Sequence, residues 1–143
     1  MPVFGAFLIL FVIFAGIYNG GSLENFIDAP AILVVGGITM GSLMVARISI
    51  KTMIKTLFKK NTSREQIQIA VAGWAQARTF VMASGWIGLL MYAMTVGHHL
   101  TYVKSIGPAV TLLLITLFYA TVLSYTVFLP IQLRLERRLS NLE

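Results

Sequence analysis

The sequence predicts an all-α protein: an integral membrane four-helix subunit with an amphipathic cytoplasmic helical segment between its second and third spans. Of its 143 residues, 57% are hydrophobic and only 11% are charged, which leaves no room for a large soluble domain. Four stretches contain no Asp, Glu, Lys or Arg: residues 1–23, 29–46, 79–103 and 105–133. A helix needs about 20 apolar residues to cross the hydrocarbon core, so each stretch can supply one span. We expect a single membrane domain over residues 1–143, with spans at approximately 3–20, 29–46, 79–98 and 107–130.

The basic residues indicate which ends of the spans face the cytoplasm. Of the 11 Lys and Arg, all except Lys104 lie between the second and third spans or after the fourth. Cytoplasmic loops carry such an excess, so both termini are expected inside the cell and the acidic Glu24 and Asp28 outside it. The net charge of +6 is therefore a signal of topology and of attraction to anionic membrane lipid. We expect no nucleic-acid partner.

The first two spans are bounded by turn and cap residues. The first span ends at Asn19-Gly20-Gly21 and lacks the basic start and the cleavage site of a signal peptide, so we expect it to be retained. Asp28 is placed to cap the second span, whose first turn accommodates Pro30. Within that span, Gly37 and Gly41 form a small-xxx-small pair, which predicts close packing of another helix or a partner.

The segment over residues 47–78 is predicted to be helical and cytoplasmic. Its basic residues recur every four positions and form one face: Arg47, Lys51, Lys55 and Lys59. An apolar stripe lies beside them: Ile50, Met53, Ile54, Leu57 and Phe58. This face can meet solvent or lipid, or engage a cytoplasmic partner. Thr62 and Glu65 have the spacing of a capping box, which predicts a new helix that continues through Arg78 into the third span.

The third and fourth spans differ in length. The third contains Gly85 and Gly88, a second candidate packing pair, and ends near His98 and His99 in an outer loop. An adjacent histidine pair is a weak metal signal, so we expect no metal site. The fourth span begins near Gly107, and its 29 uncharged residues would extend about 43 Å as a helix. That length exceeds the hydrocarbon core, so the helix should tilt or protrude before a cytoplasmic tail at 131–143.

The chemistry open to the chain is restricted by what its spans lack. The absence of cysteine excludes thiol redox and iron–sulfur chemistry, and no acid, base or histidine lies at mid-depth. Hydroxyl groups remain, among them those of Ser84, Thr116 and Tyr119. Hydroxyls can line a pathway, but they do not exchange protons near neutral pH. We therefore expect no enzymatic activity and no cofactor, and any ion carried must titrate a group on another chain.

Several segments resemble one family of membrane proteins. Residues 21–39 resemble the opening of MotA-type flagellar stator subunits, with a glycine-started loop, an F-x-D-x-P-S turn and an L-I-V-x-G-G-T helix. Residues 85–88 resemble the G-x-I-G motif of the family's third span. Residues 106–119, followed by Leu129-Pro130-Ile131, resemble the family's I-G…L-P-I helix. The chain is thus similar to the MotA/TolQ/ExbB proton-channel superfamily, and most similar to its MotA branch.

The resemblance implies a pentamer around a MotB-like or ExbD-like dimer, in the bacterial inner membrane as a multi-pass protein. The single-span partner carries a membrane Asp, and ion passage is thought to drive rotation. Thr116 matches the second threonine of the family's pathway-lining pair, with Ser84 and Tyr119 as further pathway candidates. Pro130 matches a motion-transmitting position or a helix end, and Asp28 caps a helix or steers ions at the outer loop. Thr116 can equally bond its own backbone, a packing role that stays open.

Departures from the family narrow these expectations. Ile115 and Leu89 replace a threonine and a small or hydroxyl residue, which favours H⁺ over Na⁺ as the coupling ion. The large cytoplasmic domain that engages the flagellar rotor is replaced by the short segment 47–78, so a different cytoplasmic load is expected. A small four-span transporter and a passive envelope scaffold remain as alternatives. The first would usually need an acid in span one, which residues 1–23 lack.

Overall fold

The computed structural model describes residues 2–21, 23–59, 62–99 and 106–141. All regular elements in these ranges are helical, which confirms the all-α part of the prediction. They are α1 (Pro2–Gly20), the 3-10 turn η1 (Leu23–Phe26), α2 (Ala29–Val45), α3 (Ile50–Phe58), α4 (Arg64–His99), α5 (Ile106–Val122), the π-helical segment η3 (Leu123–Phe128) and α6 (Leu129–Ser140). The predicted outer loop around Tyr102 and Lys104 lies outside the described residues.

The apolar helices are those of a membrane-embedded protein with two or three candidate spans. Arg64–Gly97 and Leu113–Ser140 are each long and apolar enough to cross a bilayer. A third candidate arises if α2 and α3 count as one span bent by 103°. The apolar segment Phe4–Gly20 of α1 is shorter than these. The predicted four-span arrangement therefore stays a prediction.

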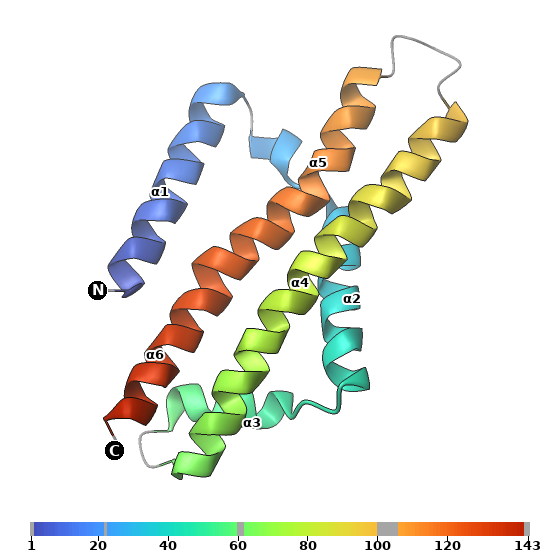
Figure 1. Ribbon diagram of the computed structural model, residues 1–143. Coiled ribbons are helices and arrows are strands. Elements are labelled where there is room, and N and C mark those ends of the chain that lie inside the picture. Colours follow the sequence, from blue (N-terminus) through green and yellow to red (C-terminus); the bar gives the residue numbers. More distant parts are fainter. Residues whose placement is uncertain (1, 22, 60–61, 100–105, 142–143) are drawn as a thin grey trace.

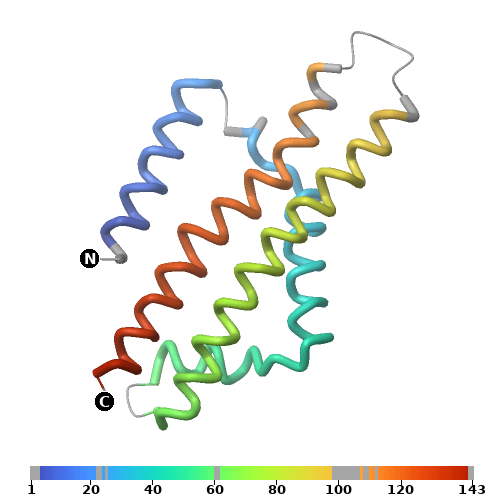
Figure 2. Tube along the Cα trace, viewed as in Figure 1, coloured from blue at the N-terminus to red at the C-terminus, as the bar shows by residue number. Residues whose placement is uncertain are grey.

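Two long helices organise the bundle (Figure 1). α4 runs side by side with the continuous helix formed by α5, η3 and α6, and α2 packs against both. α3 crosses one end of this bundle beside α4 and is nearly perpendicular to α2. α1 stands further out and contacts mainly η3 and α6. The N-terminal end of α1 and the C-terminal end of α6 both point toward the end where α3 crosses (Figure 2).

The start of α4 differs by one residue from the predicted capping box. The backbone N–H of Gln66 donates to Ser63 Oγ at 3.4 Å, so Ser63 rather than Thr62 caps the helix. The Thr62 hydroxyl instead donates to the carbonyl of Lys59 at 2.8 Å. From this cap α4 continues without a break for 36 residues, which confirms that the helix runs through Arg78 into the third apolar stretch. It also places His98 and His99 in the last turn of α4 rather than in a loop.

The amphipathic helix is shorter than the basic stripe predicts. Arg47 has a φ of 54° and lies in the turn between α2 and α3, and Lys59 follows the last residue of α3. Only Lys51 and Lys55 of the stripe are helical. The physical reason is the 103° bend, which is closed by a bond from the N–H of Ile48 to the carbonyl of Leu43. A new cap at Ser49 follows the bend and restarts the helix.

Glycine permits a very close approach of α4 to α5. A Cβ added at Gly85 would lie 2.5 Å from the Cβ of Ala120, and one at Gly88 would lie 3.0 Å from the Cβ of Thr116. No larger residue fits at Gly85 unless one helix moves away. Gly37 and Gly41 of α2 differ, because a Cβ at either would meet nothing within 4 Å in the described chain. Their predicted packing role would need another subunit or a partner helix.

Replacing Gly85 with alanine should separate α4 from α5. The added methyl group meets the short, rigid side chain of Ala120, so the helices themselves must shift. We expect the free energy of unfolding to fall by about 1–3 kcal/mol, as for other overpacked cores. The measurement is thermal unfolding of the detergent-solubilised protein. Gly41→Ala is the matched control and should be neutral or slightly stabilising, because alanine is the better helix former. Equal losses at both positions would contradict the close contact.

Candidate functional site: buried hydroxyls between three helices

Three helices bring small hydroxyl side chains into the interior of the bundle. Thr39 of α2, Ser84 of α4 and Thr116 of α5 are buried, and the last two are 0% exposed. The Thr39 Oγ1 and Ser84 Oγ atoms lie 3.3 Å apart. Ser84 and Gly88 lie one turn apart on the same face of α4, and Gly88 packs directly against Thr116. Two predicted pathway residues therefore lie at the same face of α4: Ser84 belongs to that face, and Thr116 of α5 packs against it.

Each of these hydroxyls already has a bond to its own helix. Thr39 Oγ1 donates to the carbonyl of Val35 at 2.6 Å, and Ser84 Oγ donates to that of Val81 at 2.7 Å. Each hydroxyl has one proton, so the two backbone bonds and the bond between the hydroxyls cannot all form at once. Both hydroxyl oxygens keep lone pairs that can accept a bond from an incoming donor. A protonated carboxylic acid or a water molecule is such a donor.

Thr116 is held inside the subunit rather than on its surface. Its Oγ1 donates to the carbonyl of Leu113 at 3.3 Å, a long bond within α5. That bond is the packing role expected of a threonine in a membrane helix. A pathway past Thr116 would run between α2, α4 and α5, or would require α4 and α5 to separate. Its place in a pathway stays a prediction.

Tyr119 lies at the outer end of this interior and fastens the first loop to α5. Its hydroxyl donates to the carbonyl of Phe26 and accepts the backbone N–H of Asp28, the latter at 2.9 Å. The Asp28 carboxylate accepts the N–H of Ala31 at 3.1 Å, which confirms the predicted N-cap of α2. The Tyr92 side chain of α4 lies near the Asp28 carboxylate. Tyr119 and Asp28 thus form one cluster, a contact between residues 91 apart that sequence spacing does not reveal.

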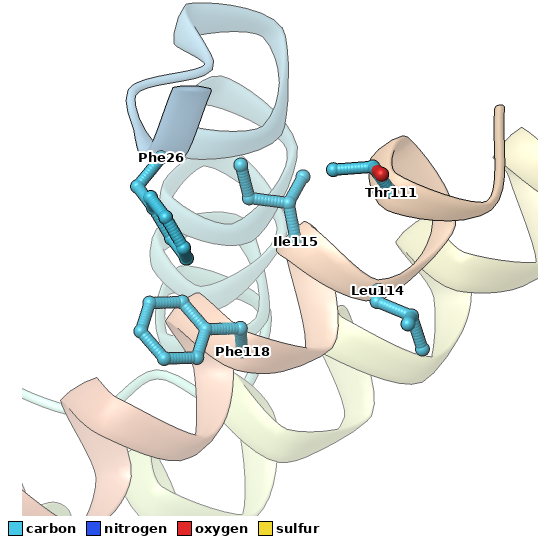
Figure 3. A pocket seen from close by; sticks show the side chains of 5 residues that line it. All are labelled: Phe26, Thr111, Leu114, Ile115 and Phe118. Carbon is cyan, nitrogen blue, oxygen red and sulfur yellow. The ribbon is translucent and has the colours of Figure 1, made fainter. Parts of the chain in front are cut away.

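An apolar pocket of about 270 Å³ opens beside this cluster (Figure 3). Its lining residues come from η1 and α5: Phe26, Thr111, Leu114, Ile115 and Phe118. The Thr111 hydroxyl donates to the carbonyl of Gly107 at 3.2 Å, so it offers no free donor to the pocket. Ile115, where the resembling family has threonine, contributes only apolar surface. The pocket suits hydrocarbon rather than an ion.

A polar cluster that the sequence reasoning missed lies between α4 and the second long helix. The Arg78 guanidinium stands 5.7 Å from the centre of the Tyr125 ring and donates to Gln132 Oε1 at 3.2 Å. Gln132 in turn donates to Glu136 at 2.8 Å. The Nε of Arg78 is buried without a hydrogen-bond partner in the described part of the chain. Arg78 and Gln132 are 54 residues apart in sequence, and no local pattern predicts their contact. The only local signal of this cluster is the four-residue spacing of Gln132 and Glu136, which places them on one face of a helix.

Pro130 marks a change of helical geometry and not a helix end. α6 continues past it to Ser140, so residues predicted as a tail are largely helical. The segment before it, Leu123–Phe128, is π-helical, and the N–H of Leu129 donates to the carbonyl of Ser124. Proline cannot donate to the preceding turn, and the wider π turn accommodates that loss. A role for Pro130 in transmitting motion stays a prediction.

Removing the hydroxyl of Tyr119 should loosen the outer loop. Tyr119→Phe leaves the carbonyl of Phe26 and the N–H of Asp28 without their partner. We expect a loss of about 1–3 kcal/mol in the free energy of unfolding and faster proteolysis of residues 21–28. Thermal unfolding and limited proteolysis in detergent measure both effects. Tyr18→Phe on the exposed face of α1 is the control and should change neither. Identical behaviour of the two variants would contradict a stabilising role for the two hydrogen bonds of the Tyr119 hydroxyl.

Comparison with known proteins adds no family assignment to this geometry. No family model matches the chain, and no curated protein matches it. The resemblance to stator subunits therefore rests on the quoted motifs alone. The function has to be argued from the chemistry of the buried hydroxyls and the uncovered helix faces.

Proposed function

We propose that this chain is an ion-channel and stator subunit of a rotary motor in the bacterial inner membrane. It forms a pentamer around a dimer of single-span MotB-like or ExbD-like partners, and it converts proton flow into torque. The observation that carries the proposal is chemical. The bundle interior holds the hydroxyls of Thr39, Ser84 and Thr116, whereas none of the carboxylates among the described residues is buried with them.

The carboxylates of the described residues lie near the two ends of the bundle. Asp28 caps α2 at the outer end, and Glu136 is bonded to Gln132 on α6. Proton transfer across the membrane needs a group that titrates, and a hydroxyl does not titrate near neutral pH. A membrane Asp on the partner supplies that group. When it is protonated it is neutral, and it can donate to an oxygen lone pair of Thr39 or Ser84.

The uncovered surfaces support assembly with other chains. Large apolar side chains are exposed on every long helix, including Leu33 and Met44 on α2 and Met94 on α4. The open faces of Gly37 and Gly41 allow a neighbouring backbone to approach α2 closely. Lipid can cover part of this surface. In a ring of identical subunits around a central partner, the neighbouring chains cover the remaining apolar surface.

The oxygen count favours H⁺ as the coupling ion. Sodium needs several oxygen ligands at once, and the buried side-chain oxygens between α2, α4 and α5 are only the hydroxyls of Thr39, Ser84 and Thr116 in the described part of the chain. Ile115 adds an apolar wall where the resembling family has an oxygen. A proton needs only one acceptor at a time. The short segment 47–78 supports a cytoplasmic load other than a standard flagellar rotor.

Purification with its native partner and imaging along the membrane normal test the assembly directly. We expect five copies of this chain around two foreign helices, with both termini on the side of α3. Replacing the partner's membrane Asp by Asn should abolish proton flux into vesicles. A monomer that conducts protons unaided would overturn the proposal. A passive scaffold, which the internally bonded hydroxyls would also suit, predicts no flux and no effect of the partner's Asp.

Thr116→Val tests whether the buried hydroxyl contributes to transport. Valine keeps the shape that packs against Gly88 and removes only the oxygen, so the ring should remain intact. We expect proton flux to fall about threefold to tenfold, the effect of one lost hydrogen bond worth about 1 kcal/mol. Vesicle acidification measured with a pH-sensitive dye gives the rate. Thr95→Val, which removes an exposed hydroxyl bonded to Met91, is the control. Unchanged flux in Thr116→Val would leave that residue a packing role.

A further inference from the structure

We propose that a pocket between the end of α3 and α6 binds the headgroup of an anionic phospholipid. The pocket has a volume of about 500 Å³. Three basic and two apolar residues line it: Leu57, Phe58, Lys59, Arg134 and Arg138. No carboxylate is among these lining residues. The site is independent of the proposed ion pathway, because it lies at the opposite end of the bundle from the Asp28–Tyr119 cluster.

Arg138 builds the pocket by holding α3 against α6. Its Nη1 donates to the carbonyl of Thr56 at 2.9 Å, and its Nη2 donates to that of Lys59 at 3.1 Å. These bonds cap carbonyls at the C-terminal end of α3, and the Lys59 carbonyl also accepts the Thr62 hydroxyl. Below them, Leu135 of α6 is buried against α4 with Leu57 packed alongside. The wall of the pocket is thus fixed by contacts between residues about 80 positions apart in sequence.

Lys59 and Arg134 supply the charge available to a ligand. Both side chains are exposed at the pocket, and neither makes an ion pair or a side-chain hydrogen bond within the described ranges. An arginine guanidinium matches two oxygens of a phosphate, and a lysine ammonium binds a third as a point charge. Arg138 is already bonded to carbonyls and adds its positive charge to the wall. The site therefore favours a phosphate diester or monoester over a neutral headgroup.

Phe58 indicates that this phosphate belongs to a lipid. Its side chain is 85% exposed, and Ile54, one turn earlier on α3, is 49% exposed. Lys51 and Lys55 flank this apolar pair, which is the pattern of a helix lying in the membrane interface. α3 crosses the end of the two long helices, the orientation such a helix needs if they span the bilayer (Figure 1). An acyl chain can lie along Phe58 while its phosphate meets Arg134.

The end of the bundle where α3 lies also carries most of the basic residues. Ten of the 11 Lys and Arg lie between the second and third apolar stretches or after the fourth. Such an excess is typical of the cytoplasmic side, whose leaflet is rich in anionic lipid. The basic side chains and the exposed apolar side chain of Phe58 thus both favour an anionic phospholipid as the ligand. A soluble phosphate would use the charges and leave Phe58 uncovered.

Native mass spectrometry of the detergent-solubilised protein tests the site with phosphatidylglycerol as the probe. Lys59→Gln combined with Arg134→Gln should weaken lipid retention about tenfold or more, because each basic contact to anionic lipid is lost. The control pair is Arg47→Gln with Arg137→Gln, which removes the same charge from exposed residues outside the pocket and should retain the lipid. Circular dichroism confirms that both variants keep their helices, since neither substitution touches Arg138.

Two further arms separate the possible ligands. Phosphatidylcholine, which has no net charge, should be retained weakly by the wild-type protein, and excess glycerol 3-phosphate should not displace phosphatidylglycerol. Phe58→Ser should weaken retention of the lipid as well. Equal loss in the pocket and control variants would show diffuse attraction and overturn the site. Displacement by glycerol 3-phosphate would show a soluble ligand instead, and retention by the pocket variant would show no site.

Discussion

The close contact between α4 and α5 is the constraint on which the rest of the bundle depends. With no side chain at Gly85 or Gly88, the two helices approach until Ala120 and Thr116 touch the backbone of α4. Van der Waals packing of this kind replaces the hydrophobic effect as the driving force between helices in lipid. It also seals the neighbouring hydroxyls from hydrocarbon. Each hydroxyl then bonds a carbonyl of its own helix, because an unsatisfied polar group there costs several kcal/mol.

That sealed interior contains none of the carboxylates of the described residues. A carboxylate placed beside Ser84 would be costly to ionise, so the subunit keeps its own acids toward the ends. In the assembly that we propose, a partner's acid would enter such an environment in its neutral, protonated form. The polar cluster around Arg78 also lies between α4 and the second long helix, and it places a fixed positive charge closer to the end where α3 crosses. Such a charge repels cations and favours one direction of approach for an acidic helix.

Local features of the fold were predictable from sequence, and contacts between distant residues were not. The cap at Asp28 and the unbroken course of α4 follow from residues within a few positions of each other. The clasp of Tyr119 on Phe26 and the bond of Arg138 to Thr56 join residues more than 80 positions apart, and no local pattern encodes them. The length of α3 was overestimated because four-residue charge spacing continues through a turn as readily as through a helix. The number of spans depends on whether the short apolar segment of α1 crosses the bilayer and on whether α2 and α3 count as one bent span.

The π-helical segment Leu123–Phe128 has a consequence for every residue that follows it. A π turn contains one residue more than an α turn, and one residue corresponds to a rotation of about 100° around an α-helix. The angular phase of side chains in α6 is therefore offset from the phase that α5 would impose if it continued unchanged. Arg138, which bonds the carbonyls of α3, lies in α6 beyond this offset. A single residue in the middle of a hydrophobic helix thus determines where a charge is presented at its end.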